Sequence, residues 1–178
     1  MEEERTLVII KPDGIVKGLV GKILCSIHAY GLRVIRSARM TLSREWVNTL
    51  YALEKQEVYF EEIVQWVSSG SVLLLEIQGP NAVSLVKWDI IGRYPNGIRG
   101  EHAENYVQNV AHASDSASAV NRELVLAESL FLREEATYRK PFLGKTVFAL
   151  TGMSESGKST VGVYLNTLGI PRLKIGRI

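Results

Sequence analysis

The chain has 178 residues, 46% of them hydrophobic and 22% charged, so it is long enough for one soluble domain or for a domain plus part of another. A formal net charge of +2 is too small to argue for a nucleic-acid or membrane partner, and a single cysteine, Cys25, excludes a disulfide framework and a cysteine-rich zinc site. The acidic start MEEER lacks a secretory pattern, and no apolar run approaches the roughly 18 residues that span a bilayer. We therefore expect a cytoplasmic protein with no nucleic-acid and no membrane partner.

Strand and helix patterns alternate along the first third of the chain. The β-branched run TLVII predicts a strand, and the proline and glycine of KPDG indicate a turn after it. Apolar residues then recur at helical spacing until Gly31, and Ser43 has the residue type of a helix N-cap. The expected elements are a strand over 6–10, a helix over 19–29, a half-buried strand over 32–40, a helix starting at Ser43 and a short helix over 58–67.

The middle of the chain continues the alternation. SVLLLEI is the clearest strand pattern, and Val120, Leu124, Ala127 and Phe131 share one face of an amphipathic helix. The expected elements are a strand over 71–77, a helix over 81–91, a loop over 92–100, a short buried strand at NVAH and a helix over 116–131. This order predicts an α+β fold of ferredoxin-like type, an antiparallel sheet covered by helices on one face.

The character of the sequence changes after Leu132. REEATYRK is charged and poor in core residues, which is typical of a linker. TVFALT then has a strand pattern, and a helical stretch runs to Leu168 after the glycine-rich segment between them. We expect a first domain over 1–132, a linker over 133–145 and a C-terminal segment over 146–178.

GMSESGKS in this last segment matches the P-loop pattern G-x-x-x-x-G-K-[ST], between a strand pattern and a helix pattern. Gly152 and Gly157 leave room for backbone N–H groups to wrap a phosphate, with Ser159 and Thr160 at the end of the loop. Lys158 would reach the outer phosphates and Ser159 would help to hold Mg²⁺. The alternative is a surface turn rich in glycine and serine. Because only 18 residues follow Thr160, we expect a truncated strand–P-loop–helix fragment.

Four segments of the first domain resemble nucleoside diphosphate kinases: TLVIIKPDGIVKGLVGKI, SSGSVLLLEIQGPNAV, NGIRG and NVAHASDSASAVNRELVLAESLF. The resemblance covers about residues 4–132, and the pairing of H-x-S-D-S with K-P-D is specific. It implies a ping-pong transferase that moves the γ-phosphate of a nucleoside triphosphate to a histidine and then to a nucleoside diphosphate. It also implies a homo-oligomer, and Mg²⁺ carried by the nucleotide phosphates with no direct metal ligand in the first domain.

On this resemblance His112 is the nucleophile, Glu123 orients its ring and Ser114 supports that carboxylate. The chemistry agrees, because imidazole with an ordinary pKa near 6.5 is largely neutral at pH 7 and can attack phosphorus without a separate base. The small neighbours of the histidine leave space for a phosphoryl group. A structural histidine or a zinc ligand is the alternative, although His28 and His102, interpreted as a helix-surface residue and a loop residue, share no ligand cluster with it.

The resemblance places six further residues around the nucleotide. Lys11 contacts the transferring phosphate and the ribose, Arg99 grips the phosphates, Asn109 holds the sugar 3′-hydroxyl, Tyr51 lies at the edge of the phosphate site, and Tyr59 stacks on the base with Ile63 packed beside it. Aromatic stacking accepts every base, which fits broad substrate use. A surface ion pair is the alternative for Arg99, and an interface or core role for Tyr59.

Two departures from the family pattern lie close together. The family's second phosphate-binding arginine corresponds to Lys87 or to Trp88, depending on the alignment. A lysine keeps the positive charge but loses the planar guanidinium that binds two oxygens at once, and a tryptophan loses both. Arg93 is a candidate substitute. The loop GRYPNGIRG is shorter than usual in the family, where it lines the nucleotide site and takes part in subunit contacts. One lost charged contact costs about 1.5 to 3 kcal/mol, so we expect a working nucleophile with weaker binding and an altered oligomer.

The competing hypothesis is a catalytically weakened nucleotide-binding and oligomerisation module attached to a P-loop kinase domain. The histidine, lysine, arginine, asparagine and glutamate of the family pattern favour the enzyme. The missing arginine and the short loop favour the module. A phosphorylated histidine that forms on the chain distinguishes the two.

Overall fold

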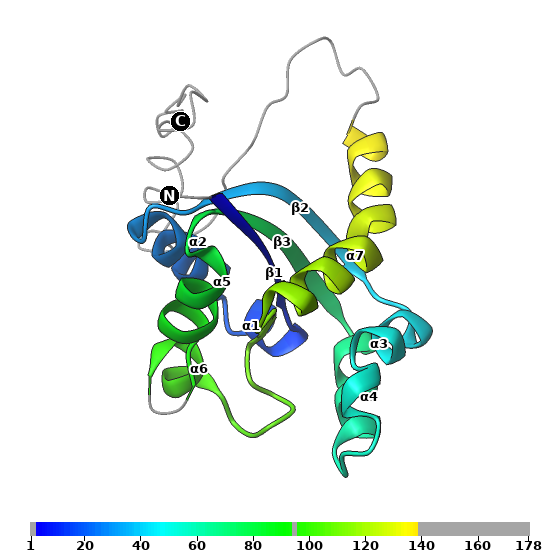
Figure 1. Ribbon diagram of the computed structural model, residues 1–178. Helices are drawn as coiled ribbons and strands as arrows, with labels where there is room; N and C mark the ends of the chain where they lie inside the picture. The colour runs from blue at the N-terminus through cyan, green and yellow to red at the C-terminus, as the bar shows by residue number, and fades with distance from the viewer. Residues whose placement is uncertain (1–2, 94–95, 139–178) are drawn as a thin grey trace, which may run out of the picture. The chain divides into compact units, whose positions relative to one another are not determined.

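The computed structural model describes residues 3–93 and 96–138 (Figure 1). Its elements are β1 (Glu3–Ile10), α1 (Pro12–Val16), α2 (Val20–Ala29), β2 (Arg33–Thr41), α3 (Arg44–Leu50), the 3₁₀ turn η1 (Ala52–Glu54), α4 (Phe60–Ser68), β3 (Ser71–Pro80), α5 (Ala82–Ser84), the π-helical turn η2 (Leu85–Ile91), α6 (Gly97–His102), β4 (Ala111–Ala113) and α7 (Ala117–Tyr138). They form one compact unit. The predicted P-loop segment lies outside the described residues.

The four strands form one antiparallel sheet in the order β2-β3-β1-β4, which confirms the predicted α+β fold. β1 lies between β3 and β4, and its last residues, Val8 to Ile10, pair with both neighbours. Ile9 is opposite His112 in the pairing of β1 with β4. The short strand β4 therefore attaches the histidine segment to the middle of the molecule.

The helices pack on both faces of the sheet, so the prediction of one covered face is wrong (Figure 1). Leu7 and Ile9 point into a core that α3, α4 and α7 complete, and Val8 and Ile10 point into a second core with α2, η2 and α6. Successive side chains of a strand face opposite ways. The unbroken apolar run LVII therefore needs apolar partners on both sides, and this run was the sequence signal for a doubly covered sheet.

Two predicted boundaries are also wrong. Gly97–His102, predicted as loop, forms α6; the chain turns tightly at Gly92 and Gly97, both at positive φ (74° and 67°), where glycine lacks the clash of a Cβ. Residues 133–138, predicted as linker, continue α7 to Tyr138. Arginine, glutamate and alanine have high helix propensity, so this segment can be helical even though it has no apolar face. Ser43 caps α3 as predicted, since its Oγ accepts a hydrogen bond of 3.2 Å from the Trp46 backbone N–H.

A fully buried carboxylate links the sheet to α7. Glu76 on β3 accepts a hydrogen bond of 2.9 Å from Nη1 of Arg5 on β1, and another from Nε of Arg36 on β2. The same arginine donates to both oxygens of Glu128 on α7, at 2.9 and 2.8 Å, and its guanidinium lies 4.7 Å from the ring centroid of Phe131. A buried charge of this kind is stable only with its partners, so this network fixes α7 over the sheet.

In the part of the chain that the structure describes, no helix combines the length and the apolar character needed to span a membrane.

Candidate active site

A cleft of about 300 Å³ opens where β4, α6 and α7 meet the segment from α3 to α4. All the site residues predicted in the first domain line it except Ser114, which is buried: Lys11, Tyr51, Tyr59, Ile63, Lys87, Arg99, Asn109, His112 and Glu123. These residues span more than a hundred positions of the chain. The fold therefore brings the predicted set together.

His112, Glu123 and Ser114 form a hydrogen-bonded group at the base of the cleft. His112 lies on β4, and a bond of 2.8 Å joins its Nε2 to Oε2 of Glu123 on α7. Ser114 Oγ donates to the same oxygen, also at 2.8 Å. Because an ionised carboxylate only accepts, Nε2 is the donor in this bond.

The charge of Glu123 is maintained although the residue is only 3% exposed. Burial alone would raise its pKa, but the hydrogen bonds from His112 and Ser114, with the nearby positive charge of Arg122, hold the pKa below its ordinary value. Arg122 Nη2 lies 3.4 Å from the other carboxylate oxygen, Oε1. An ionised carboxylate thus orients the imidazole and stabilises any positive charge that develops on it.

The residue before β4 has a strained backbone. Val110 has φ 74°, a left-handed conformation that costs a β-branched residue of order 1–3 kcal/mol. Its N–H donates to Asp13 Oδ2 at 2.7 Å, and its carbonyl accepts from the Lys11 N–H at 2.8 Å. Gly14 lies so close that a Cβ there would be 2.7 Å from the Val110 oxygen. The KPDG turn therefore fixes the course of the chain two residues before His112.

Asp13 was missed as a site residue by the sequence reasoning, although it lies in the quoted KPDG. Its Oδ1 accepts a hydrogen bond of 3.1 Å from Trp66 Nε1 on α4, while Oδ2 holds Val110. One carboxylate thus joins the N-terminal turn, α4 and the histidine strand. Proline, aspartate and glycine after a strand were the available signal, but they indicated only a turn.

Lys11 is a buried lysine, 1% exposed, at the end of β1. Its Nζ donates to the Val107 carbonyl at 3.1 Å and to Asn109 Oδ1 at 2.7 Å. Burial, helped by the positive charge of Arg99, lowers the pKa of Lys11 to about 7. Near and above pH 7 such a lysine is only partly protonated without a bound anion, and an anion that enters the cleft would raise its pKa and complete the protonation.

Arg99 extends from α6 toward the histidine strand. Its Nε donates to the Ala111 carbonyl at 3.1 Å and Nη2 donates to the same oxygen, so the guanidinium is held beside His112. Burial lowers its pKa from the ordinary value, as expected for a cation with carbonyls as its partners. The contacts argue against the surface ion pair that was the alternative for this residue.

The structure also places the two other histidines of the chain. His28 is exposed on α2, as predicted, whereas His102 is the last residue of α6 rather than part of a loop, with Nε2 3.2 Å from Lys22 Nζ. Within 3–93 and 96–138, no group of three or more histidine, cysteine, aspartate or glutamate side chains is arranged to hold a metal ion.

Comparison with known proteins decides the family. The profile of the family described as nucleoside diphosphate kinase matches residues 4–135. The nucleoside diphosphate kinase of Ignicoccus hospitalis is 36% identical over 137 residues, 74% of this chain and 90% of that protein. That of Sulfurisphaera tokodaii is 36% identical over 141 residues, 76% of this chain and 92% of that protein. The chain belongs to the nucleoside diphosphate kinase family.

Solved structures agree with this assignment. A crystal structure of the Aquifex aeolicus nucleoside diphosphate kinase has a TM-score of 0.66 and 30% identity, over 70% of this chain and 94% of that one. The Halobacterium salinarum nucleoside diphosphate kinase in complex with CDP has a TM-score of 0.65 and 29% identity, over 70% and 87%. As a nucleoside diphosphate kinase, the chain transfers the terminal phosphate of a nucleoside triphosphate to a nucleoside diphosphate.

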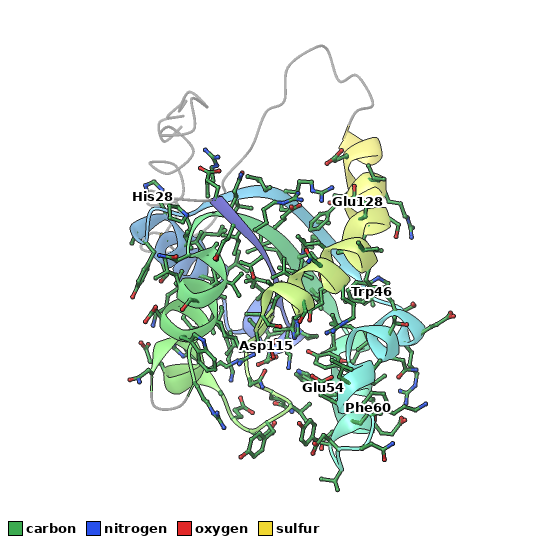
Figure 2. All side chains as sticks on the ribbon, in the orientation of Figure 1. His28, Trp46, Glu54, Phe60, Asp115 and Glu128 are labelled. Carbon is green, nitrogen blue, oxygen red and sulfur yellow. The ribbon has the colours of Figure 1, made fainter. Side chains whose placement is uncertain are left out.

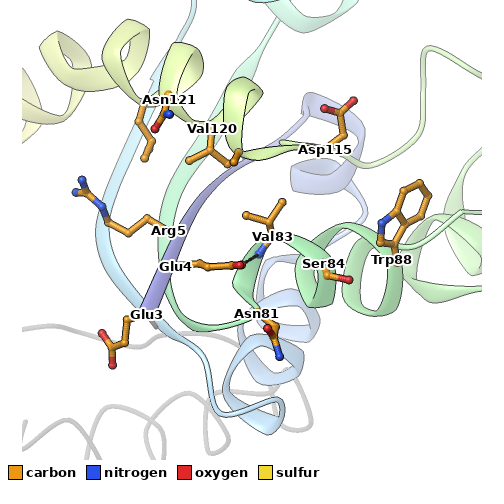
Figure 3. A pocket seen from close by; sticks show the side chains of 12 residues that line it. Glu3, Glu4, Arg5, Asn81, Val83, Ser84, Trp88, Asp115, Val120 and Asn121 are labelled. Atoms are coloured by element: carbon orange, nitrogen blue, oxygen red, sulfur yellow. Dashed lines mark hydrogen bonds between the residues drawn. The ribbon is translucent and has the colours of Figure 1, made fainter. Parts of the chain in front are cut away.

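Of the two positions at which the resemblance places a second phosphate-binding arginine, Lys87 lines the cleft. Lys87, on η2, donates from Nζ to the Ala113 carbonyl at 3.1 Å, and burial together with Arg99 lowers its pKa. Trp88 points into a neighbouring hollow together with Ser84 and Val83 (Figure 3). Arg93 is exposed and does not line the cleft, so it is no substitute in this structure.

Several cleft residues of this nucleoside diphosphate kinase were missed by the sequence reasoning. Tyr106 and Arg122 line the cleft, as do the carboxylates Glu54 and Asp115, which are labelled in Figure 2. Asp115 lies within the quoted H-x-S-D-S, so its motif was a signal. Arg122 lies in the quoted segment NVAHASDSASAVNRELVLAESLF but was not singled out. Glu54 and Tyr106 come from segments without a recognisable pattern, and only the fold brings them to the site.

Proposed function

We propose that phosphoryl transfer by this chain proceeds through a phosphohistidine at Nδ1 of His112. The observation that carries the proposal is the 2.8 Å bond from Nε2 to Glu123. It fixes the proton on Nε2 and leaves the Nδ1 lone pair for attack on phosphorus. Tyr51 supports the ring edge-on, with 5.5 Å between the centroids and 80° between the planes.

In the first half-reaction the Nδ1 lone pair forms a bond to the γ-phosphorus. The bond from that phosphorus to the β,γ-bridging oxygen breaks, and the nucleoside diphosphate leaves with the electron pair. In the second half-reaction a terminal oxygen of another nucleoside diphosphate attacks the same phosphorus, and the N–P bond breaks. Histidine returns unchanged, which gives the ping-pong order.

Three cations neutralise the phosphate oxygens, which is the main requirement of phosphoryl transfer. Lys11, Lys87 and Arg99 line one cleft and are held by backbone carbonyls or by Asn109. Each exchanges these neutral partners for phosphate oxygens when a nucleotide enters. Asn109 then holds the sugar 3′-hydroxyl.

The donor set of the cleft fits Mg²⁺ carried by the nucleotide. Glu54 and Asp115 line the cleft, and their carboxylate oxygens would hold such an ion through its water ligands. When bound, Mg²⁺ would neutralise part of the charge on the phosphate oxygens. The base stacks on Tyr59, with Ile63 packed beside that ring.

The test is transfer from γ-labelled ATP to the full chain. We expect an acid-labile, base-stable label that ADP or GDP removes, and no label on His112→Ala. A label that survives in His112→Ala would place the nucleophile elsewhere. Absence of label under conditions where the nucleotide binds would exclude the phosphohistidine.

A homo-oligomer belongs to this proposal. β2 is an edge strand of the sheet, and Ile35 on it is 39% exposed, so a second copy can pair with this edge and cover it. Light scattering of the full chain measures its oligomeric state. A monomer at micromolar concentration would contradict it.

We assign the segment GMSESGKST to a P-loop that follows the kinase domain, whose helix α7 extends to Tyr138. The support is the motif between a strand pattern and a helix pattern. Because His112 has its own phosphate-binding cations, we expect Lys158→Ala to leave the exchange of label almost unchanged. A large loss would mean that the two motifs form one site.

A further inference from the structure

A further cation, Arg122 on α7, lines the cleft and holds no phosphate in the proposed function. The first turns of α7 present Ser118, Arg122 and Glu123 to the cleft. Val120 and Asn121 line the neighbouring hollow instead (Figure 3). Residues four apart share one face of a helix, so Arg122 extends from the same side of α7 as Ser118. A guanidinium therefore enters the cleft from the helix that carries the orienting carboxylate.

The guanidinium of Arg122 is weakly held in the free protein. Its Nη2 lies 3.4 Å from Glu123 Oε1, which is longer than the usual range of about 2.7–3.2 Å for such a hydrogen bond. Within the part of the chain that the structure describes, this is the one hydrogen bond of its side chain. The side chain is 44% exposed. Most of its N–H donors are thus available to a ligand.

The other arginine of the cleft is more committed. Nε and Nη2 of Arg99 both donate to the Ala111 carbonyl, so one edge of its planar fork is used by the backbone. Lys87 is a point charge and cannot bind two oxygens in a fixed plane. Arg122 therefore has the guanidinium that is free to accept two phosphate oxygens at once without first giving up a backbone partner.

The charge of the cleft also depends on Arg122. Among the described residues that line the cleft, the three cations already assigned to phosphate are matched by three carboxylates, Glu54, Asp115 and Glu123. These charges balance when all the groups are ionised, and Lys11, with its pKa lowered to about 7, is only partly protonated near neutral pH. Arg122 thus gives the cleft the net positive charge that attracts a polyphosphate.

Arg122 is close to the histidine that receives the phosphate. The carboxylate of Glu123 has Oε1 beside Arg122 and Oε2 at 2.8 Å from His112 Nε2, so one carboxylate separates the guanidinium from the imidazole. Burial raises the pKa of Glu123, the contacts with His112 and Ser114 lower it, and Arg122 adds the smallest lowering. Arg122 can therefore leave Glu123 for a phosphate while the carboxylate stays ionised.

We infer that Arg122 is a further phosphate-binding residue, which holds the γ-phosphate of the nucleoside triphosphate beside His112. This inference rests on the proposed function, because the phosphate that Arg122 holds is the one that His112 receives. The planar fork accepts two oxygens of that phosphate and adds to the single donor group of Lys87. A nucleoside diphosphate lacks this phosphate and does not use the contact.

The test measures, by calorimetry on the full chain, the binding of ADP and of an ATP analogue with an imido group in place of the β,γ-bridging oxygen. For Arg122→Gln we expect about tenfold weaker binding of the analogue, the low end for a charged hydrogen bond at a partly exposed site, and ADP binding within about twofold of the parent. Arg122→Lys keeps the charge without the fork and should recover only part of the loss.

Arg44→Gln is the matched control. Arg44 is 53% exposed, pairs with Glu61 and does not line the cleft, so this variant should bind both nucleotides as the parent does. An equal loss in Arg44→Gln would refute the assignment. Full recovery by Arg122→Lys would refute the role of the fork.

Unchanged analogue binding in Arg122→Gln would overturn the inference, as would an equal loss for ADP. Slower labelling of His112 at saturating ATP with unchanged analogue binding would mean that Arg122 acts only through Glu123, which also overturns it. A parent chain that is labelled normally, with an Arg122→Gln variant that binds the analogue normally, refutes this inference alone. A parent chain that binds the analogue and takes no label refutes the proposed function.

Discussion

Glu123 gives the sharpest test of how the site activates its histidine. One oxygen of this carboxylate accepts two hydrogen bonds of 2.8 Å, from His112 Nε2 and Ser114 Oγ. Glu123→Gln keeps the shape and removes the charge. A hydrogen bond to a charged group contributes about 1 kcal/mol more than a neutral one, so two such bonds lose about 2 kcal/mol. The positive charge that develops on the ring loses the same support, so we expect phosphorylation about 30-fold slower.

The assay is single-turnover labelling by γ-labelled ATP, with nucleotide saturating so that binding does not contribute. Glu128→Gln is the matched control, because its carboxylate lies on the same helix, pairs with Arg36 and faces away from the cleft. Its rate should stay within about twofold of the parent. A Glu123→Gln chain that labels as fast as the parent, or an equal loss in the control, would refute the orienting role.

Three further changes follow from the structure. Lys11 has a pKa of about 7 in the free protein, so its proton is present below pH 7 and is lost above it. ADP binding at pH 8 should therefore take up nearly one proton, which calorimetry in buffers of different ionisation enthalpy measures. Lys11→Met should abolish this uptake. Glu76→Ala should cost about 2–3 kcal/mol in urea unfolding, below the 3–5 of a fully buried pair because its two arginines are partly exposed. Gly14→Ala should cost about 1–3 kcal/mol in the same assay through its contact with Val110, whereas Gly21→Ala, with open space around it in α2, should stabilise by about 0.5–1 kcal/mol. Equal effects of the two glycine changes would contradict the close approach at KPDG.

Many of the residues that the sequence identified lie in segments that resemble the family. His112, Lys11 and Arg99 were predicted as site residues because they match the family pattern in NVAH, KPDG and NGIRG. Asp13 lay in such a motif, yet its contact with Val110 crosses 97 positions and was not visible. Tyr106 had no pattern at all, because its aromatic partner lies on a different element.

The sequence by itself determined most of the strands and helices and the family pattern, since these depend on local periodicity and on residue type, and the resemblance to the family then led to the prediction of His112 as the nucleophile. Only the tertiary structure decided that both faces of the sheet are covered and that Lys87, not Trp88, enters the cleft. It also showed that Nε2 of His112 is the nitrogen that contacts Glu123. These outcomes depend on contacts between segments far apart in the chain, whose direction and distance no local pattern encodes.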